Sequence, residues 1–227
     1  MNRTAASHRE PAATPVQPVL TETDIGNLAH ELANPLNAIA ITTHLAKRML
    51  ARGDSAAAAE ALNTIGADCD RCARLLRDAQ EYLSLAIHRP RDTVDLAAML
   101  DEVSQPLRVR GEVAIHASDA CRVEGDAPAL RRLFREVLCN AFDHGAHRVS
   151  VDLECDGSEV NTRISDDGPG IDPALRARIF DAFYSTQRQH HSGTGLAVAR
   201  SIAQAHRGDI EIEDAGRGSV FRVTLPV

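Results

Sequence analysis

Hydrophobic residues recur every three or four positions over two long stretches near the start of the sequence. In the first stretch, from about Glu22 to Leu50, they are Ile25, Leu28, Leu32, Leu36 and Ile39. This spacing predicts an amphipathic helix, and Thr21 or Thr23 is available as its N-cap.

The second stretch runs from about Ala56 to Ile87, after a break in which Gly53 interrupts the pattern and Ser55 is a suitable cap. Its apolar stripe comprises Leu62, Ile65, Cys69, Cys72, Leu76, Ala79, Leu83 and Ala86. Because Cys69 and Cys72 lie on this stripe, we expect them to be small buried core residues. Two such helices form a hairpin, and two hairpins must associate to cover both stripes. The sequence therefore predicts a dimeric four-helix bundle.

From residue 90 onward, shorter helical and strand patterns alternate. Strands are predicted near 93–96, 113–115, 121–123, 148–155, 159–165, 209–213 and 219–225, and helices near 97–105, 127–144, 173–181 and 196–207. Asp126 is the expected cap of the longest helix, and Asp156 with Gly157 forms the turn of the strand hairpin. This mixture predicts an α+β fold: a disordered tail at 1–20, the helical hairpin at 21–89 and an α/β sandwich at 90–227.

The composition narrows the classes of function. A net charge of −7 argues against nucleic acid or an acidic membrane as a partner, since both select cationic surfaces. No apolar run reaches the roughly 18 residues of a membrane span, and the first residues lack the apolar core of a secretory signal. Five cysteines are an odd number at irregular spacing, typical of reduced thiols. We therefore expect a cytoplasmic protein.

The first helix carries a candidate nucleophile. His30 lies on the side opposite the apolar stripe, with Glu31 beside it and Asn34 one turn further on. An exposed imidazole near a carboxylate can act as a nucleophile, because the carboxylate orients the ring and accepts its proton. The alternative for a single histidine is an ordinary surface side chain.

The neighbouring residues favour the first interpretation. The segment 30–37, His-Glu-Leu-Ala-Asn-Pro-Leu-Asn, resembles the H-box of bacterial sensor histidine kinases. Four further segments resemble the other boxes of that family in the same order: the N-box at 136–144, the first glycine box at 166–170, the F-box at 180–183 and the second glycine box at 193–196. Five boxes in the correct order and spacing are a specific signal.

The resemblance implies a histidine kinase core that binds ATP and Mg²⁺ in the second domain. Asp166 is the expected acceptor for the adenine amine, and glycines at 168 and 170 let the backbone approach the base. The phosphates are expected at a helix N-terminus. The implied nucleotide contacts are Asn140, His144, Asp166, Gly168, Gly170, Thr194, Gly195 and Leu196, and the implied magnesium ligands are Asn140 and Glu136, since Mg²⁺ prefers oxygen ligands.

The implied reaction begins with transfer of a phosphoryl group to His30, with Glu31 orienting or deprotonating the ring. The group then passes to an aspartate of a response-regulator receiver domain. Asn34 stands where related kinases use a polar side chain to orient water, so the resemblance also implies a phosphatase activity. Ile41 and Leu45 lie on the same face as His30 and form either a receiver docking surface or part of the bundle.

Two residues depart from the kinase pattern. Glu136 replaces an asparagine, and Asp143 replaces a basic residue. Together with Asn140 they resemble the equivalent helix of the gyrase and mismatch-repair ATPases, in which the glutamate activates water. Two alternatives therefore remain: an ATPase of that branch, and a phosphotransfer or docking dimer with a weak ATP site.

Two further segments have open roles. Residues 182–192 resemble the ATP lid of the family, in which Arg188, His190 and His191 either meet phosphate or belong to a solvated loop. With only 29 residues before His30, we expect no membrane anchor and no sensor domain. Input would then come from a separate sensor protein or from the tail. The alternative is that the sequence is a fragment of a longer chain.

Overall fold

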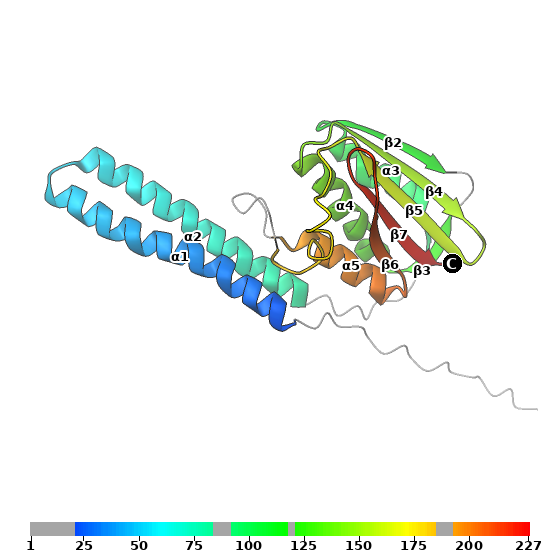
Figure 1. Cartoon of the computed structure of the whole chain (residues 1–227), viewed down its shortest axis with the longest axis horizontal. Helices are drawn as coiled ribbons and strands as arrows, with labels where there is room; N and C mark the ends of the chain where they lie inside the picture. The colour runs from blue at the N-terminus through cyan, green and yellow to red at the C-terminus, as the bar shows by residue number, and fades with distance from the viewer. Residues whose placement is uncertain (1–20, 84–91, 118–120, 185–192) are drawn as a thin grey trace, which may run out of the picture.

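The computed structural model describes residues 21–83, 92–117, 121–184 and 193–227. A long helical hairpin extends from a second domain that combines helices and a sheet (Figure 1). The predicted architecture, a hairpin followed by an α/β sandwich, is confirmed. The predicted tail, the end of the second helix, the boundary near residue 89 and most of the proposed lid lie outside the described residues.

The hairpin consists of α1 (Glu22–Ala51) and α2 (Ser55–Leu83). Thr21 caps α1 as predicted, and its backbone N–H and hydroxyl both donate to the Asp24 carboxylate. The predicted cap of α2 is wrong by one residue. Ser55 is already helical, and Asp54 accepts a hydrogen bond from the N–H of Ala57 at 3.0 Å. Asp54 therefore acts as the N-cap, because its carboxylate accepts from the third backbone N–H of the helix.

The apolar stripes of the hairpin are only partly covered within one chain. Small side chains at Ala46, Ala58 and Ala61 bring the two helices together, and Leu75 is also buried. Within one chain Cys69 is exposed and Cys72 is half-buried, so a single hairpin does not provide the burial expected for these two residues. The large apolar side chains left exposed are Ile25, Leu36, Ile41, Leu45, Leu50, Leu62, Leu76 and Leu83.

The second domain contains two sheets. Strands β1 (Asp92–Asp95) and β3 (Arg122–Gly125) form an antiparallel pair. The larger sheet has the order β2-β4-β5-β7-β6, in which β2 and β4 are parallel and the other pairs antiparallel. Its strands are β2 (Glu112–Ala117), β4 (Arg148–Cys155), β5 (Glu159–Asp166), β6 (Asp209–Glu213) and β7 (Val220–Pro226).

The helices of this domain are α3 (Leu96–Ser104), α4 (Ala127–Asp143) and α5 (Gly195–Ala205), and a 3₁₀ turn follows α3 at Gln105–Leu107. Asp126 caps α4 as predicted, with its carboxylate accepting from the N–H of Ala129. The helix predicted at 173–181 is wrong. That segment forms successive turns in which most backbone bonds span three residues rather than four. None of the helices that the structure describes combines the length and apolar composition of a membrane-crossing segment.

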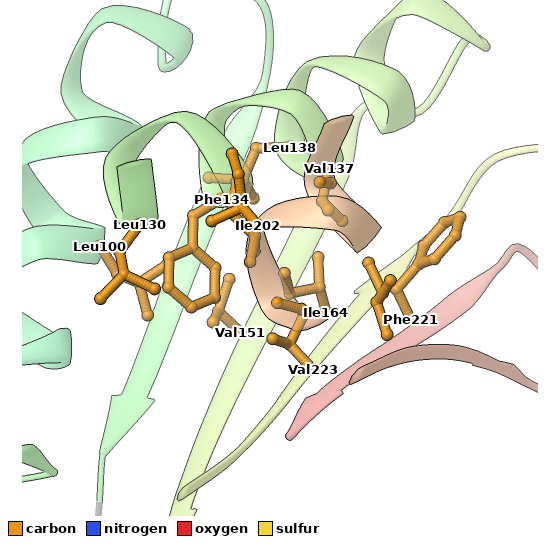
Figure 2. Packing of buried hydrophobic residues seen from close by; sticks show 14 of the residues in the cluster. Leu100, Leu130, Phe134, Val137, Leu138, Val151, Ile164, Ile202, Phe221 and Val223 are labelled. Atoms are coloured by element: carbon orange, nitrogen blue, oxygen red, sulfur yellow. The ribbon is translucent and has the colours of Figure 1, made fainter. Parts of the chain in front are cut away.

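Helices α4 and α5 pack on one face of the large sheet and enclose the main core (Figure 2). Leu130, Phe134 and Leu138 of α4 are fully buried, as are Val151 of β4 and Val223 of β7. Each such side chain contributes about 1.5–3 kcal/mol on burial. The core therefore fixes one face of α4 and leaves its opposite face for other groups.

The open end of the hairpin contacts the second domain beside α5 (Figure 1). The Asp24 carboxylate accepts a hydrogen bond from the N–H of Ala182 at 2.9 Å. The rings of Tyr82 and Phe183 pack edge-on, with their centroids 6.4 Å apart. Phe183 has a φ of 64°, a conformation that costs a non-glycine residue of order 1–3 kcal/mol. These contacts with the hairpin offset that cost, so the two domains share part of one core.

Asp156 in the β4–β5 turn gives a pH-dependent test of this fold. Hydrogen bonds from the N–H groups of Ser158 and Glu159 lower the pKa of its carboxyl below the ordinary 3.8. A lowered folded-state pKa stabilises the fold at neutral pH, and the benefit is lost as pH falls through that pKa. We expect Asp156→Asn to lower the melting temperature at pH 7, and we expect the difference from the wild type to shrink as the pH falls below 3.8. A difference that persists unchanged at low pH would contradict this assignment.

Candidate functional site

A pocket of about 360 Å³ opens between α4, the loop after β5 and the start of α5. Residues far apart in the sequence meet there, because the sheet brings the end of β5 beside α4. Eight of the predicted binding residues line this pocket: Glu136, Asn140, His144, Asp166, Gly170, Thr194, Gly195 and Leu196. Gly168 is not part of the lining, and it contacts Asp166 instead.

Asp166 is oriented by the backbone around it. Its Oδ1 accepts hydrogen bonds from the N–H of Gly168 at 2.8 Å and of Ser219 at 3.2 Å. Gly170 has a φ of 81°, and a Cβ there would lie 2.9 Å from the carbonyl oxygen of Gly218. Only glycine fits so close an approach without strain. The loop therefore holds Asp166 with its second oxygen available to an amine such as that of adenine.

The adjacent Asp167 has a structural role. Its Oδ1 accepts from the N–H of His147 at 2.7 Å and of Arg148 at 2.9 Å, at the start of β4. The hydrogen bonds from Arg148 and His147 lower the pKa of this carboxyl. Asp167 does not line the pocket, so of the two consecutive aspartates Asp166 is the one that a bound molecule could contact.

The face of α4 that lines the pocket carries two carboxylates beside Asn140. Glu136 and Asp143 lie one turn on either side of Asn140, and all three line the pocket. Asp143 pairs with Arg110, whose guanidinium also lies 5.7 Å from the centre of the Phe142 ring. Burial raises the pKa of the Cys139 thiol, and the Asp143 and Glu136 carboxylates raise it further. The thiol is therefore kept protonated, and it is unsuited to nucleophilic chemistry.

The start of α5 lies directly against this face. A Cβ on Gly195 would approach Oε2 of Glu136 to 2.9 Å, so glycine lets the helix N-terminus reach α4. The first N–H groups of a helix have no intrahelical acceptors and attract phosphate oxygens. Thr194, Gly195 and Leu196 are therefore positioned to hold the phosphate end of a nucleotide.

Five charged residues of the pocket were not predicted from the sequence. Arg132 and Arg135 come from α4, Asp78 and Glu81 come from α2, and Asp172 belongs to the segment after β5. Arg132 donates to Glu81 at 2.9 Å, and both arginines lie within 4 Å of Glu136. Helical spacing could have identified Arg132, which precedes Glu136 by four positions. No sequence signal places α2 beside this pocket.

The predicted catalytic residues on α1 do not line the pocket. His30 and Asn34 are exposed on the same face of the helix, as predicted. Glu31 differs from the expectation of an exposed carboxylate beside His30, since it is 5% exposed and accepts a hydrogen bond from Arg71 of α2 at 2.9 Å. One position along a helix is a rotation of about 100°, which turns Glu31 toward α2. Ile41 and Leu45 are exposed. Arg188, His190 and His191 lie outside the described residues.

Two family models match the sequence. Residues 25–85 match the His Kinase A (phospho-acceptor) domain, and residues 125–227 match the histidine kinase-, DNA gyrase B- and HSP90-like ATPase domain. The first match covers most of the hairpin and the second covers the pocket. The ATP-binding character predicted for the second domain is confirmed by this match.

Named relatives support the same assignment. The probable sensor protein PcoS of Escherichia coli is 31% identical over 215 residues, which cover 88% of this chain and 45% of PcoS. The probable sensor histidine kinase TcrY of Mycobacterium tuberculosis is 29% identical over 216 residues, or 89% of this chain and 45% of TcrY. The chain therefore spans about half the length of these relatives.

Solved structures of similar fold include a mycobacterial sensor histidine kinase, MprB, at 27% identity and a TM-score of 0.54, covering 60% of this chain and 97% of that chain. The histidine kinase ThkA, in complex with the response regulator protein TrrA, has a TM-score of 0.66 at 21% identity, covering 90% of this chain and 61% of that chain. The second likeness supports the fold alone.

The two aspartates provide a matched test of the pocket. Asp166→Asn places an amide N–H₂ where the adenine amine needs an acceptor, so we expect ATP binding about 10- to 100-fold weaker, the loss of a hydrogen bond to a charged group. Asp167→Asn keeps an oxygen for the N–H groups of His147 and Arg148 and should bind ATP like the wild type. Isothermal titration calorimetry measures both. Equal affinities in the two variants would contradict the role of Asp166.

Proposed function

The chain belongs to the sensor histidine kinase family, and we propose that it transfers the γ-phosphoryl group of ATP to His30 and then to an aspartate of a response-regulator receiver domain. The observation that carries this proposal is the pocket, which gathers Asn140, Asp166 and Gly195 from three separate segments. An exposed His30 on the phospho-acceptor helix supplies the matching nucleophile.

The residues of the pocket fit ATP with Mg²⁺. Asp166 and Gly170 suit the adenine, with Gly168 supporting Asp166, while Thr194, Gly195 and Leu196 suit the phosphates. Asn140 and Glu136 offer hard oxygen ligands one helical turn apart, and His144 extends the same face of α4. The described residues contain no group of three or more His, Cys, Asp or Glu side chains that could hold a metal. The protein would therefore bind Mg²⁺ together with phosphate oxygens and water rather than alone.

In the proposed transfer, an imidazole nitrogen of His30 forms a bond to the γ-phosphorus while the bond to the β–γ bridging oxygen breaks and ADP leaves. Glu31 is the proposed acceptor of the imidazole proton. In this conformation the Glu31 carboxylate pairs with Arg71, so catalysis requires it to turn toward His30. Bound Mg²⁺ would neutralise the charge that develops on the phosphate oxygens.

We assign both the dephosphorylation of the receiver domain and the contact with that domain to the face of α1 that carries His30. Asn34 lies one turn from His30 and would orient the water that removes phosphate from the receiver aspartate. Ile41 and Leu45 are 70% and 45% exposed, and would form the apolar part of the docking surface. The solved structure of similar fold, ThkA, is in complex with the response regulator protein TrrA, and a partner of this kind supports the proposal.

The partner that covers the remaining stripe of the hairpin is proposed to be a second copy of the chain. Leu36, Leu62 and Leu76 are each more than half exposed in the single hairpin. Two hairpins that bury these residues form a four-helix bundle. The match to the His Kinase A domain supports this homodimer.

The compartment and the input are proposals as well. All five cysteines are free, as expected for thiols kept reduced in the cytoplasm, where ATP is available. A separate sensor protein is proposed to supply the signal.

A second candidate function is ATP hydrolysis. Glu136 lies beside the start of α5, where a nucleotide's terminal phosphates would be held, and its carboxylate is suited to activating water there. Asp143 stands at a position where the kinase pattern has a basic residue. The loss of that positive charge favours instead a docking dimer with a weak ATP site. Labelled ATP distinguishes both alternatives from the kinase, because only the kinase transfers the labelled phosphoryl group to His30.

The main test is incubation of the full chain with γ-labelled ATP and Mg²⁺. We expect acid-labile, base-stable label on the wild type and none on His30→Ala. His44→Ala, an exposed histidine on the same helix, is the matched control and should be labelled like the wild type. Label on both variants would move the phospho-acceptor away from His30. Phosphate release without label, abolished by Glu136→Gln, would favour the ATPase.

The dimer has its own test. Leu62→Glu combined with Leu76→Glu places charges in the proposed bundle interface, so we expect light scattering to give half the mass of the wild type. Asn63→Glu, at an exposed position of α2 that is rotated by about 100° from Leu62, is the control for added charge and should remain dimeric. A double variant with the same mass as the wild type would rule out this interface.

A further inference from the structure

The pocket has an unusual charge balance for a nucleotide site. Glu136 and Asp143 line it from α4, and Asp78 and Glu81 line it from α2. A triphosphate brings further negative charge into the same space. Binding therefore requires cations from the protein besides any metal ion.

Arg110 does not meet this need directly. It pairs with Asp143 and packs over the Phe142 ring, but it does not line the pocket. It neutralises the carboxylate that stands where relatives carry a base. The phosphates must then be met by other side chains.

Among the described residues, the arginines that line the pocket are Arg132 and Arg135. The side chain of Arg135 is 59% exposed, whereas that of Arg132 is 27% exposed. Nη2 of Arg132 lies 2.9 Å from Oε2 of Glu81, and its Nε is 3.8 Å from Oε1 of Glu136. This Nε is buried and has no hydrogen-bond acceptor among the described residues. Arg132 therefore has donor capacity that its present neighbours do not use.

Arg132 also lies close to the expected phosphate position. Glu136, one turn further along α4, reaches within 2.9 Å of the point where a Cβ on Gly195 would stand. Nε of Arg132 lies 3.8 Å from Oε1 of the same Glu136, so the guanidinium and the start of α5 both approach this carboxylate. A guanidinium binds phosphate oxygens with two parallel hydrogen bonds, a better match than a single carboxylate oxygen.

We propose that Arg132 is a phosphate-binding residue of the ATP site, held by Glu81 of the hairpin when nucleotide is absent and transferred to the terminal phosphates when ATP binds. This inference rests on the proposed function in requiring that ATP occupies the pocket. In this arrangement Glu81 competes with ATP for Arg132. Nucleotide binding then breaks one ion pair between α4 and α2.

The test is binding of ATP, ADP and AMP to the full chain with Mg²⁺, measured by calorimetry. Arg132→Gln should weaken ATP binding about 10- to 100-fold, weaken ADP binding less and leave AMP unchanged. The matched control is Arg131→Gln, the adjacent arginine of α4, which pairs with Glu102 and does not line the pocket. It should bind all three nucleotides like the wild type.

Glu81→Gln separates a phosphate ligand from a purely structural bridge. It frees Arg132 without removing it, so ATP should bind as well as in the wild type or a few-fold more tightly. Arg132→Lys, which keeps a positive charge, should recover part of the lost ATP affinity. If Glu81→Gln weakens ATP binding as much as Arg132→Gln, or if the loss is the same for ATP and AMP, the inference is overturned.

The outcomes also separate this inference from the proposed function. A wild type that binds no ATP would overturn both. ATP binding that is unaffected by Arg132→Gln would overturn only the role of Arg132. Normal nucleotide discrimination with no label on His30 would support the role of Arg132 and contradict the proposed transfer.

Discussion

The packing of α4 against the large sheet is the interaction on which the rest of the structure depends. Leu130, Phe134 and Leu138 are buried on one face of this helix, and the helical period then fixes where Glu136 and Asn140 must point. Core and site are therefore two faces of a single element. A substitution that rotates or shifts α4 would misplace every polar group that it contributes to the pocket.

The sequence predicted elements in which local pattern and chemistry agree. The stripe of α4, its Asp126 cap and the Asp156 turn follow from side-chain spacing and short-range hydrogen bonds, and the structure contains all three. The segment 173–181 was predicted as a helix, yet it forms turns. Its Phe180 ring packs edge-on against Phe221 of β7, a tertiary contact that no local pattern contains and that can override helical propensity.

The missed features have a common physical cause, namely dependence on how elements that are distant in the sequence pack against one another. Glu31 lies next to His30 in the sequence, yet α2 supplies Arg71 and turns the carboxylate into an intrahairpin ion pair. Arg132 is paired with Glu81, a residue 51 positions away on another element. No local pattern contains such distances. Cys69 similarly follows the apolar stripe, but the single hairpin leaves that part of α2 exposed.

The contact between Tyr82 and Phe183 has a consequence for how this protein can be recombined. The ring pair, the Asp24 bond to Ala182 and the left-handed backbone of Phe183 form one unit made from three distant segments. A chimera that joins this hairpin to a relative's catalytic domain at the interdomain linker would separate the members of that unit. The unit that can be exchanged between relatives is thus larger than either domain. It is defined by side-chain contacts between the domains rather than by a single boundary in the sequence.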